Sequence, residues 1–332
     1  MMRNLRSALV ATLALATAPL PALAGDLTLY SGRGESLVAP IIAAFTAETG
    51  INVNVRYAGT SELAVLLQEE GAASPADLFW AQDAAALGAV AGLFAPLPEA
   101  LVGAVPAAYR DTENRWVATS GRGRVLAYST ERVEVDALPL TLAAMTEPEW
   151  RGRIALAPTN GSFLAHVTAM RVVLGEEATR AWLEGLLANQ PVMVRNNTAI
   201  LQAIADGEAD IGVTNNYYLA RFLQRDADFP VSQTLFATQG DIGNLLMVAG
   251  MGVLASSDHS DEAQAFVRFL LSPAAQQYFT GEVAEFPVVP GVIVTRQDIN
   301  LDDVIEAAPR VDLNAIGDLE GTLEMLREVG LI

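Results

Sequence analysis

The chain of 332 residues contains no cysteine and no lysine, and it has only two histidines. Without cysteine, disulfides, thiol catalysis and metal sites built on sulfur are excluded. Without lysine, neither Schiff-base chemistry nor the lysine of a phosphate-binding loop is available. His166 and His259 are isolated from each other, so the sequence shows no basis for a Ser-His-Asp triad or a zinc hydrolase site.

Positive charge is also scarce. The chain has 20 basic residues, all arginine, against 39 acidic ones, which gives a net charge of −19. This balance argues against binding to nucleic acid or to an anionic membrane surface. Apolar residues make up 52% of the chain and charged residues 18%, which indicates a packed globular protein rather than an acidic disordered one.

The first 24 residues have the features of a signal peptide. Arg3 and Arg6 form a short basic region, an apolar stretch follows over residues 7–18, and Ala22-Leu23-Ala24 fits a cleavage signature. The apolar stretch is too short to span a bilayer. We therefore expect residues 1–24 to be cleaved and the mature chain to be exported to the periplasm, without membrane insertion.

Short apolar segments alternate with amphipathic ones along the rest of the chain. This pattern predicts βαβ units with parallel sheets, and the length suggests two domains. The predicted strands are 27–30, 51–55, 76–80, 153–157, 210–214 and 251–254. The predicted helices are 35–49, 60–70, 83–90, 162–174, 176–188 and 199–205, with more than one further helix within 261–279. Thr60 or Ser61 is expected to cap the second of these helices. No linker separates the two halves, so we expect two lobes, more than one crossover between them, and a ligand cleft.

Polar or glycine-containing loops follow several of the predicted strands. They are residues 31–35, 81–83, 158–162 and 215–218. Ligands of parallel sheets bind at the carboxyl ends of the strands, and helix N-termini favour anions. Thr159-Asn160-Gly161-Ser162 therefore fits either an oxyanion cradle or an ordinary N-cap turn, and Asn197 admits the same two interpretations.

Tyr217 and Tyr218 are adjacent at the end of a predicted strand, where a helix begins. Tandem aromatic residues commonly serve core packing. At this position, however, two phenol oxygens can face one cleft, and phenolate is a hard anionic oxygen donor of the kind that Fe(III) prefers. The pair is therefore a candidate half-site for ferric iron.

Several motifs resemble those of the periplasmic ferric-ion-binding proteins, the substrate-binding components of bacterial iron(III) ABC importers. The most specific is Asn215-Asn216-Tyr217-Tyr218, and the resemblance extends over essentially the whole mature chain. The others are Leu29-Tyr30-Ser31-Gly32, Glu69-Glu70-Gly71, residues 74–79, Ser120-Gly121-Arg122, residues 158–164, Leu201-Gln202-Ala203 and Glu285-Phe286-Pro287.

The resemblance implies a two-lobed α/β periplasmic binding fold. It assigns residues 25–122 and 249–300 to the N-terminal lobe and residues 123–248 and 301–332 to the C-terminal lobe. It implies that Tyr217 and Tyr218 bind Fe(III) and that a synergistic anion, phosphate or carbonate, completes the coordination. The implied anion-binding residues are Asn160, Gly161, Ser162, Asn197 and Asn215, with Arg122 as an accessory cleft residue.

The N-terminal side of the implied site departs from the family pattern. Gly34 stands where some members carry a histidine ligand, Gln82 replaces a glutamate ligand, and Phe163 stands at the place of an extra tyrosine. The residues that could substitute as accessory ligands are Glu35, Tyr57, Glu62 and Asp83, with Gln82 as a much poorer neutral ligand.

The prediction is a monomeric, non-enzymatic carrier that captures Fe(III) and delivers it to an inner-membrane ABC permease. An alternative is a binding protein for an organic or phosphorus-containing anion, or for a chelate such as ferric citrate. An exported hydrolase using acidic residues is a further alternative, but the sequence offers no nucleophile-base arrangement for it.

Overall fold

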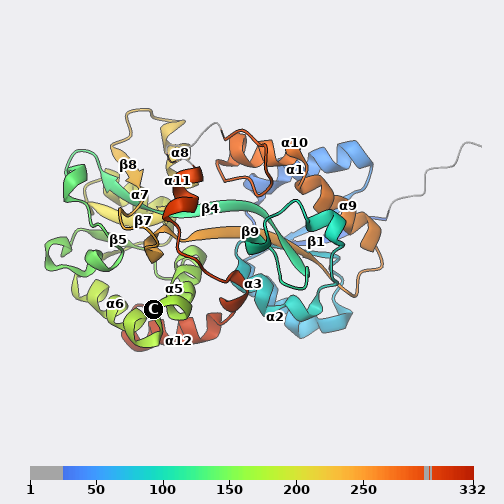
Figure 1. Cartoon of the computed structure of the whole chain (residues 1–332), viewed down its shortest axis with the longest axis horizontal. Helices are drawn as coiled ribbons and strands as arrows, with labels where there is room; N and C mark the ends of the chain where they lie inside the picture. The colour runs from blue at the N-terminus through green and yellow to red at the C-terminus, as the bar shows by residue number, and fades with distance from the viewer. Residues whose placement is uncertain (1–24, 295–298, 300) are drawn as a thin grey trace, which may run out of the picture.

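The computed structural model describes residues 25–294, 299 and 301–332. The predicted signal peptide lies outside the described residues. Two α/β lobes stand side by side, and two long strands run horizontally between them in Figure 1. The N-lobe contains β1, β2, β3, α1, α2, α3, α9 and α10, and the C-lobe contains β5 to β8, α5 to α8 and α12.

The strands form a continuous sheet in the order β2-β1-β3-β9-β4-β7-β5-β6, with β8 paired to β4. Pairing is parallel among β1, β2 and β3 and among β5, β6 and β7, but β4 and β9 run antiparallel to their neighbours. The bounds are β1 Leu27–Ser31, β2 Val53–Tyr57, β3 Leu78–Ala81, β4 Trp116–Ser129, β5 Ile154–Leu156, β6 Val192–Met193, β7 Ile211–Asn215, β8 Val231–Thr234 and β9 Leu246–Val253.

Strand β4 joins the two lobes. Its first part pairs with β9 from Trp116 to Gly123, and its second part pairs with β7 from Arg124 to Tyr128 and with β8 from Leu126 to Ser129. The chain thus crosses between the lobes in β4 and returns in β9, as the prediction of more than one crossover required.

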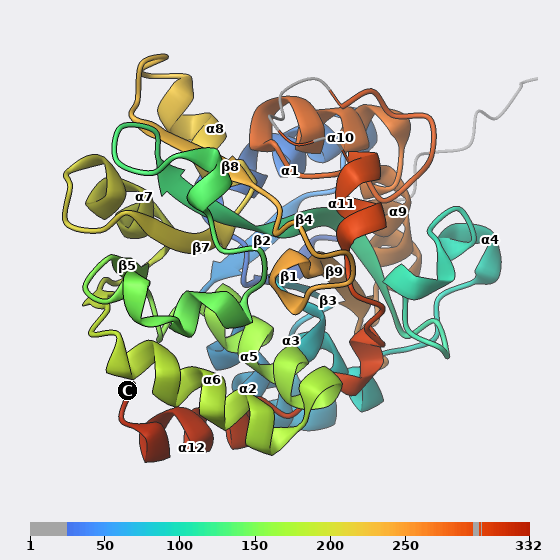
Figure 2. The same cartoon turned by 60° about the vertical axis from the view of Figure 1, so that its left-hand side comes forward.

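Helices cover the sheet in both lobes, as the two views show (Figures 1 and 2). Their bounds are α1 Glu35–Thr49, α2 Thr60–Glu70, α3 Ala84–Ala89, α4 Glu99–Val102, α5 Gly161–Leu174, α6 Glu176–Ala188, α7 Asn197–Ala205, α8 Tyr217–Leu223, α9 Ser260–Leu270, α10 Pro273–Tyr278, α11 Leu301–Ala307 and α12 Leu319–Val329. The C-terminal helix α12 packs on α5 and α6, where Arg171 and Arg180 form ion pairs with Asp318 and Glu328. The last helix of the chain therefore belongs to the C-lobe.

The predicted element order is confirmed, with several corrections. Helices 35–49, 60–70 and 176–188 have the predicted bounds, and Gly50 ends the first with a left-handed φ of 77°. The predicted cap of α2 is wrong, because Gly59 is the N-cap and no side chain caps the helix. The predicted parallel pairing is found within each lobe, among β1, β2 and β3 and among β5, β6 and β7. The antiparallel strand β4 was not predicted, and the antiparallel strand β9 is longer than the predicted segment 251–254.

The core is apolar and continuous across most of the molecule. Trp80 and Trp116 are fully buried on neighbouring regions of the sheet. Phe79 on β3, Phe45 on α1 and Phe266 on α9 are buried in the same N-lobe core. Among the described residues, no helix is both long enough and apolar enough to cross a membrane.

Candidate functional site

Tyr217 and Tyr218 lie at the start of α8, directly after β7, as predicted. Their rings stack with centroids 4.3 Å apart, and the Arg221 guanidinium lies 5.2 Å and 5.7 Å from the two ring centres. Gly212 lets β7 approach α7 closely, because a Cβ there would lie 2.5 Å from the Ile200 side chain. This close packing holds β7 against α7, and the far end of β7 leads into the tyrosine pair.

The two phenols differ in their surroundings. Tyr217 is almost fully buried, whereas Tyr218 is half-buried. Burial, and then the neighbouring Tyr218, raise the pKa of Tyr217 above its ordinary value. The positive charges of Arg122 and Arg33 act in the opposite direction. The Tyr217 oxygen therefore lies in a dry site that is flanked by positive charge.

Gln82 faces Tyr217 from the N-lobe. Its side-chain nitrogen lies 3.4 Å from the Tyr217 hydroxyl, and its side-chain oxygen accepts a hydrogen bond of 3.0 Å from Arg33. Arg33 also binds both carboxylate oxygens of Glu285, at 2.9 Å and 2.7 Å. Ser120 donates to the same carboxylate at 2.6 Å. A buried polar chain thus leads from the crossing strand to the phenol.

The ion pair of Arg33 and Glu285 is completely buried. Burial alone would raise the pKa of Glu285. The charge of Arg33 and its hydrogen bonds outweigh burial and hold this pKa below its ordinary value. Neither residue was predicted as part of the site, although Glu285 stands in a segment that carries the family resemblance and Arg33 stands in the predicted strand-end loop 31–35.

Arg122 is buried on β4, not solvated at the surface. One of its terminal nitrogens donates to the backbone carbonyl of Gln82. Within the described part of the chain, its Nε and Nη1 atoms have no hydrogen-bond partner. Unpaired donors on a buried cation are costly unless a ligand satisfies them.

The predicted anion-binding residues come together in the C-lobe. Asn160 caps α5 by accepting from the backbone N–H of Ser162 at 3.1 Å, and its oxygen also lies 3.4 Å from the side-chain nitrogen of Asn197. Asn215 donates to the Ser162 hydroxyl at 2.9 Å. Gly161 is the first residue of α5 and is exposed. Donor groups at the start of a 14-residue helix make this loop suited to an oxyanion.

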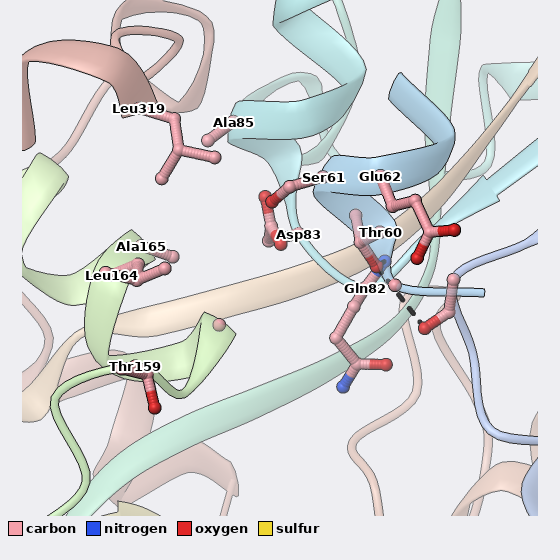
Figure 3. Close-up of a pocket in the computed structure, with 13 residues that line it drawn as sticks. Thr60, Ser61, Glu62, Gln82, Asp83, Ala85, Thr159, Leu164, Ala165 and Leu319 are labelled. Atoms are coloured by element: carbon pink, nitrogen blue, oxygen red, sulfur yellow. Dashed lines mark hydrogen bonds between the residues drawn. The ribbon is translucent and has the colours of Figure 1, made fainter. Parts of the chain in front are cut away.

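A cavity of about 400 Å³ separates the two lobes beside this loop. In Figure 3, Thr159, Leu164, Ala165 and Leu319 lie on one side and Thr60, Ser61, Glu62 and Gln82 on the other. Gln82 lines this cavity and also contacts Tyr217, so the cavity and the tyrosine pair adjoin.

The other predicted accessory residues differ in their surroundings, and Glu62 and Asp83 line the same cavity as Gln82. Glu35 is exposed at the start of α1. The pKa of Tyr57 is raised by the burial of its own side chain and by the charge of Glu35. Asp83 caps α3 by accepting from the backbone N–H of Ala86 at 2.9 Å. Within the described residues, no hydrogen bond joins Glu35, Tyr57, Glu62 or Asp83 to the tyrosine pair, nor do three His, Cys, Asp or Glu side chains gather at one metal-sized site.

His166, which the sequence shows as an isolated histidine, has a structural position. It is buried in α5, and its Nε2 donates to the carbonyl of Ile242 at 2.8 Å. Burial and the charge of Arg124 lower the pKa of His166 to about 3. The imidazole is therefore neutral at physiological pH.

Arg124 was not predicted as a site residue. It is 1% exposed, and it donates to the side-chain oxygen of Asn215 and to the carbonyl of Val213, both at 2.9 Å. Burial and the neighbouring Arg122 lower the pKa of Arg124 to about 9, so the guanidinium is charged at neutral pH. Arg122 and Arg124 are two residues apart in one strand, so their side chains lie on the same face of the sheet. This spacing was the signal in the sequence that could have pointed to Arg124 as a site residue.

The chain matches proteins of known role over most of its length. Residues 40–309 match the family model of bacterial extracellular solute-binding proteins. The chain is 36% identical over the full length of both chains to the major ferric iron-binding protein of Neisseria meningitidis serogroup A. It is 33% identical to the Fe(3+)-binding periplasmic protein of Serratia marcescens, over 92% of this chain and 90% of the relative.

A solved structure agrees with the sequence matches. Iron-bound HitA from Pseudomonas aeruginosa superimposes with a TM-score of 0.86 at 32% identity, over 92% of this chain and 99% of that chain. The predicted two-lobed fold and the predicted resemblance to ferric-ion-binding proteins are both confirmed by these matches.

Proposed function

Since this chain belongs to the family of bacterial extracellular solute-binding proteins, we propose that it captures Fe(III) in the cleft between its lobes and delivers it to an ABC permease. Relatives at 36% and 33% identity are named as ferric iron-binding proteins. These names describe carriers rather than enzymes, and they do not favour a metal-free organic or phosphorus-containing anion as the cargo. Iron is the transported substrate here.

The stacked pair Tyr217 and Tyr218 carries the proposal. Two phenolates supply hard anionic oxygen donors to a trivalent cation, and both come from one rigid helix start. Iron loading requires each phenol to lose its proton. The buried positive charges of Arg122 and Arg33 beside Tyr217 favour the anionic form of the phenol.

An oxyanion, phosphate or carbonate, is the proposed partner of the metal. Asn160, Gly161, Ser162, Asn197 and Asn215 would hold it at the start of α5. The unpartnered nitrogens of Arg122, within the described residues, supply further donors beside Gln82. The charge balance of the cleft supports this assignment. Arg33 has Glu285 as its counter-ion, whereas the buried Arg122 and Arg124 form no ion pair among the described residues. The cleft therefore holds more buried positive than negative charge.

The lobes would close on the loaded site by bending at β4 and β9. We propose residues 25–122 and 249–300 as one lobe and 123–248 and 301–332 as the other. The change of pairing partners along β4 near Gly123 supports this boundary. We also propose that the protein is a monomer and that it acts in the periplasm after residues 1–24 have been cleaved.

The test is ferric loading of the purified protein. Wild-type protein loaded from ferric citrate should show a visible tyrosinate-to-iron charge-transfer band. The Tyr217→Phe, Tyr218→Phe double variant should lose the band and more than about a hundredfold of iron affinity, beyond the loss typical of outer-shell changes. Tyr128→Phe, a buried tyrosine on β4, is the matched control and should keep both. Unchanged iron affinity in the double variant would refute the site.

A further inference from the structure

Asn216 stands between β7 and the tyrosine pair, and its side chain is used away from the helix that it precedes. It is 3% exposed and occupies the N-cap position of α8, yet its side chain forms no cap hydrogen bond to the described residues of that helix. An asparagine at this position usually accepts from one of the first N–H groups of its helix. The Asn216 amide therefore serves another part of the molecule.

Two hydrogen bonds join Asn216 to Gly123 on the crossing strand β4. The backbone N–H of Asn216 donates to the Gly123 carbonyl, and its side-chain oxygen accepts from the Gly123 N–H, both at 3.0 Å. Gly123 is the last residue of β4 that pairs with β9, and Arg124 is the first that pairs with β7. Asn216 thus binds the crossing strand at the point where the two proposed lobes meet.

The side-chain nitrogen of Asn216 reaches the N-lobe. It donates to the backbone carbonyl of Ala284 at 3.3 Å. Ala284 follows α10 and a π-helical turn, and its φ of 60° and ψ of 33° lie in the left-handed region. A residue with a Cβ costs free energy in this region and persists there where surrounding contacts hold it. The hydrogen bond from Asn216 is one of these contacts.

The next two residues of the same segment bind the N-lobe and the crossing strand. Glu285 forms the buried ion pair with Arg33 of the N-lobe. Phe286 exchanges two backbone hydrogen bonds with Gly121 on β4, both 2.7 Å long. We call residues 284–286 the hinge strap. Its three consecutive residues contact the C-lobe, the N-lobe and the crossing strand in turn.

We propose that Asn216 is a positioning residue that links closure of the lobes to the orientation of the tyrosine pair, with its hydrogen bond to Ala284 acting as a latch between the lobes. This inference rests on the proposed function, because the tyrosine pair is the proposed iron site. Rotation of the lobes about Gly123 changes the distance between the Asn216 nitrogen and the Ala284 carbonyl, since these groups belong to the two proposed lobes. Loss of the bond shifts the population toward the open cleft, and an open cleft releases its cargo faster.

Asn216→Asp separates the latch from the bond to the crossing strand. The new carboxylate still accepts from the Gly123 N–H, but at mildly alkaline pH it is ionised and has no donor for the Ala284 carbonyl. Release of ferric iron to excess citrate should then be about tenfold faster than in wild type, because the hydrogen bond is replaced by two facing oxygens. The tyrosinate-to-iron charge-transfer band should keep its wavelength, because the tyrosine pair is still held to Gly123.

Asn216→Leu removes the hydrogen bonds to both Gly123 and Ala284. This variant should release iron at least as fast as Asn216→Asp, and it should also shift the charge-transfer band, because Tyr217 is no longer held to the crossing strand. A general loss of stability would not separate the band from the release rate in this way. Small-angle X-ray scattering on iron-free protein reports the lobes directly, and both variants should have a larger radius of gyration than wild type.

Asn189→Asp is the matched control. Asn189 is 4% exposed, and its side-chain nitrogen donates to the carbonyls of Met145 and Glu147, at 3.1 Å and 2.9 Å, within the proposed C-lobe. The substitution also sets a carboxylate against carbonyl oxygens, so it should lower the melting temperature as the Asn216 variants do. It should leave iron release, the charge-transfer band and the radius of gyration as in wild type. Thermal unfolding checks every variant, and if one of the two Asn216 variants does not fold, the other decides the question.

The outcomes distinguish the latch from the proposed function. A wild-type release rate or a wild-type radius of gyration in folded Asn216→Asp overturns the latch even where iron loading is normal, and an unshifted band in Asn216→Leu overturns the positioning of the tyrosine pair. If the rate, the radius and the band all change as expected, the role of Asn216 stands. If wild-type protein binds no iron, the proposed cargo is refuted, and scattering on the iron-free variants alone decides whether the latch exists.

Discussion

The two walls of the cleft differ in how they hold charge. On the N-lobe wall, Arg33 is neutralised by Glu285, and the group presented to Tyr217 is the uncharged amide of Gln82. On the C-lobe wall, two phenols stand beside a loop of donors, and the buried Arg124 has no ion-pair partner among the described residues.

The difference shows which wall is built for the cargo. A closed ion pair is electrostatically complete and has little affinity left for a ligand. An unpaired buried cation and oriented donors are incomplete until an anion arrives. We therefore interpret the C-lobe wall as the binding half-site and the N-lobe wall as a neutral cover that closes over it.

The largest expected effect tests the completeness of the N-lobe wall. Arg33→Met leaves Glu285 buried with Ser120 as its remaining partner, which should lower the free energy of unfolding by about 3–5 kcal/mol. Urea denaturation measures the loss. The double variant Arg33→Met, Glu285→Met should recover much of it, because both charges are removed together. If the Arg33→Met variant is as stable as wild type, the ion pair does not stabilise the N-lobe wall.

The next effect concerns His166, which lies behind the C-lobe loop. The pKa of His166 is about 3 in the folded protein and 6.5 in the unfolded chain. Between these two values the imidazole is protonated in the unfolded chain but not in the folded protein. Stability from this residue is complete above pH 6.5 and falls as the pH drops toward 3. At about pH 5 the loss should be on the order of 2 kcal/mol.

His166→Gln should remove this slope while retaining a donor for the carbonyl of Ile242. The free energy of unfolding is measured by denaturant titration between pH 7 and pH 5. Most carboxylates remain ionised in this range, because their ordinary pKa is about 4. A slope in the variant equal to that of wild type would show that other groups cause the pH dependence.

The smallest effect sharpens the contrast between the walls. Gln82→Glu places a carboxylate 3.4 Å from the Tyr217 hydroxyl position and should increase ferric affinity about tenfold. The gain is limited because Arg33, which now donates to Gln82, would share the new charge. Citrate competition monitored by the charge-transfer band measures the affinity. Gln68→Glu, a change on the exposed face of α2, is the matched control and should leave the affinity unchanged. Weaker iron binding by Gln82→Glu would show that the N-lobe wall requires a neutral amide.

Local sequence signals were sufficient for three of the helices, whereas α4, α11 and α12 were not predicted. The bounds of α1, α2 and α6 follow from their amphipathic patterns and from glycines at their ends. The strand-to-helix junction at Tyr217 was also predictable, because β7 is short, apolar and followed directly by a helix.

The crossing strand β4 was not predictable from such signals. It contains Ser120, Arg122 and Arg124, all fully buried, in a segment that reads as polar and glycine-rich. These side chains are buried because β7, β8 and β9 pair with the strand and because partners reach them from distant segments.

The sequence by itself determined the two-lobed α/β class, the position of the tyrosine pair at a strand end, and the grouping of amides in the loops, because these depend on periodicity and turn chemistry. Only the tertiary structure decided how charge is shared between the walls. Arg33 meets Glu285 across 252 positions, and Arg124 meets Asn215 across 91. A pattern in one segment carries no information about a hydrogen-bond partner that folding brings from so far along the chain.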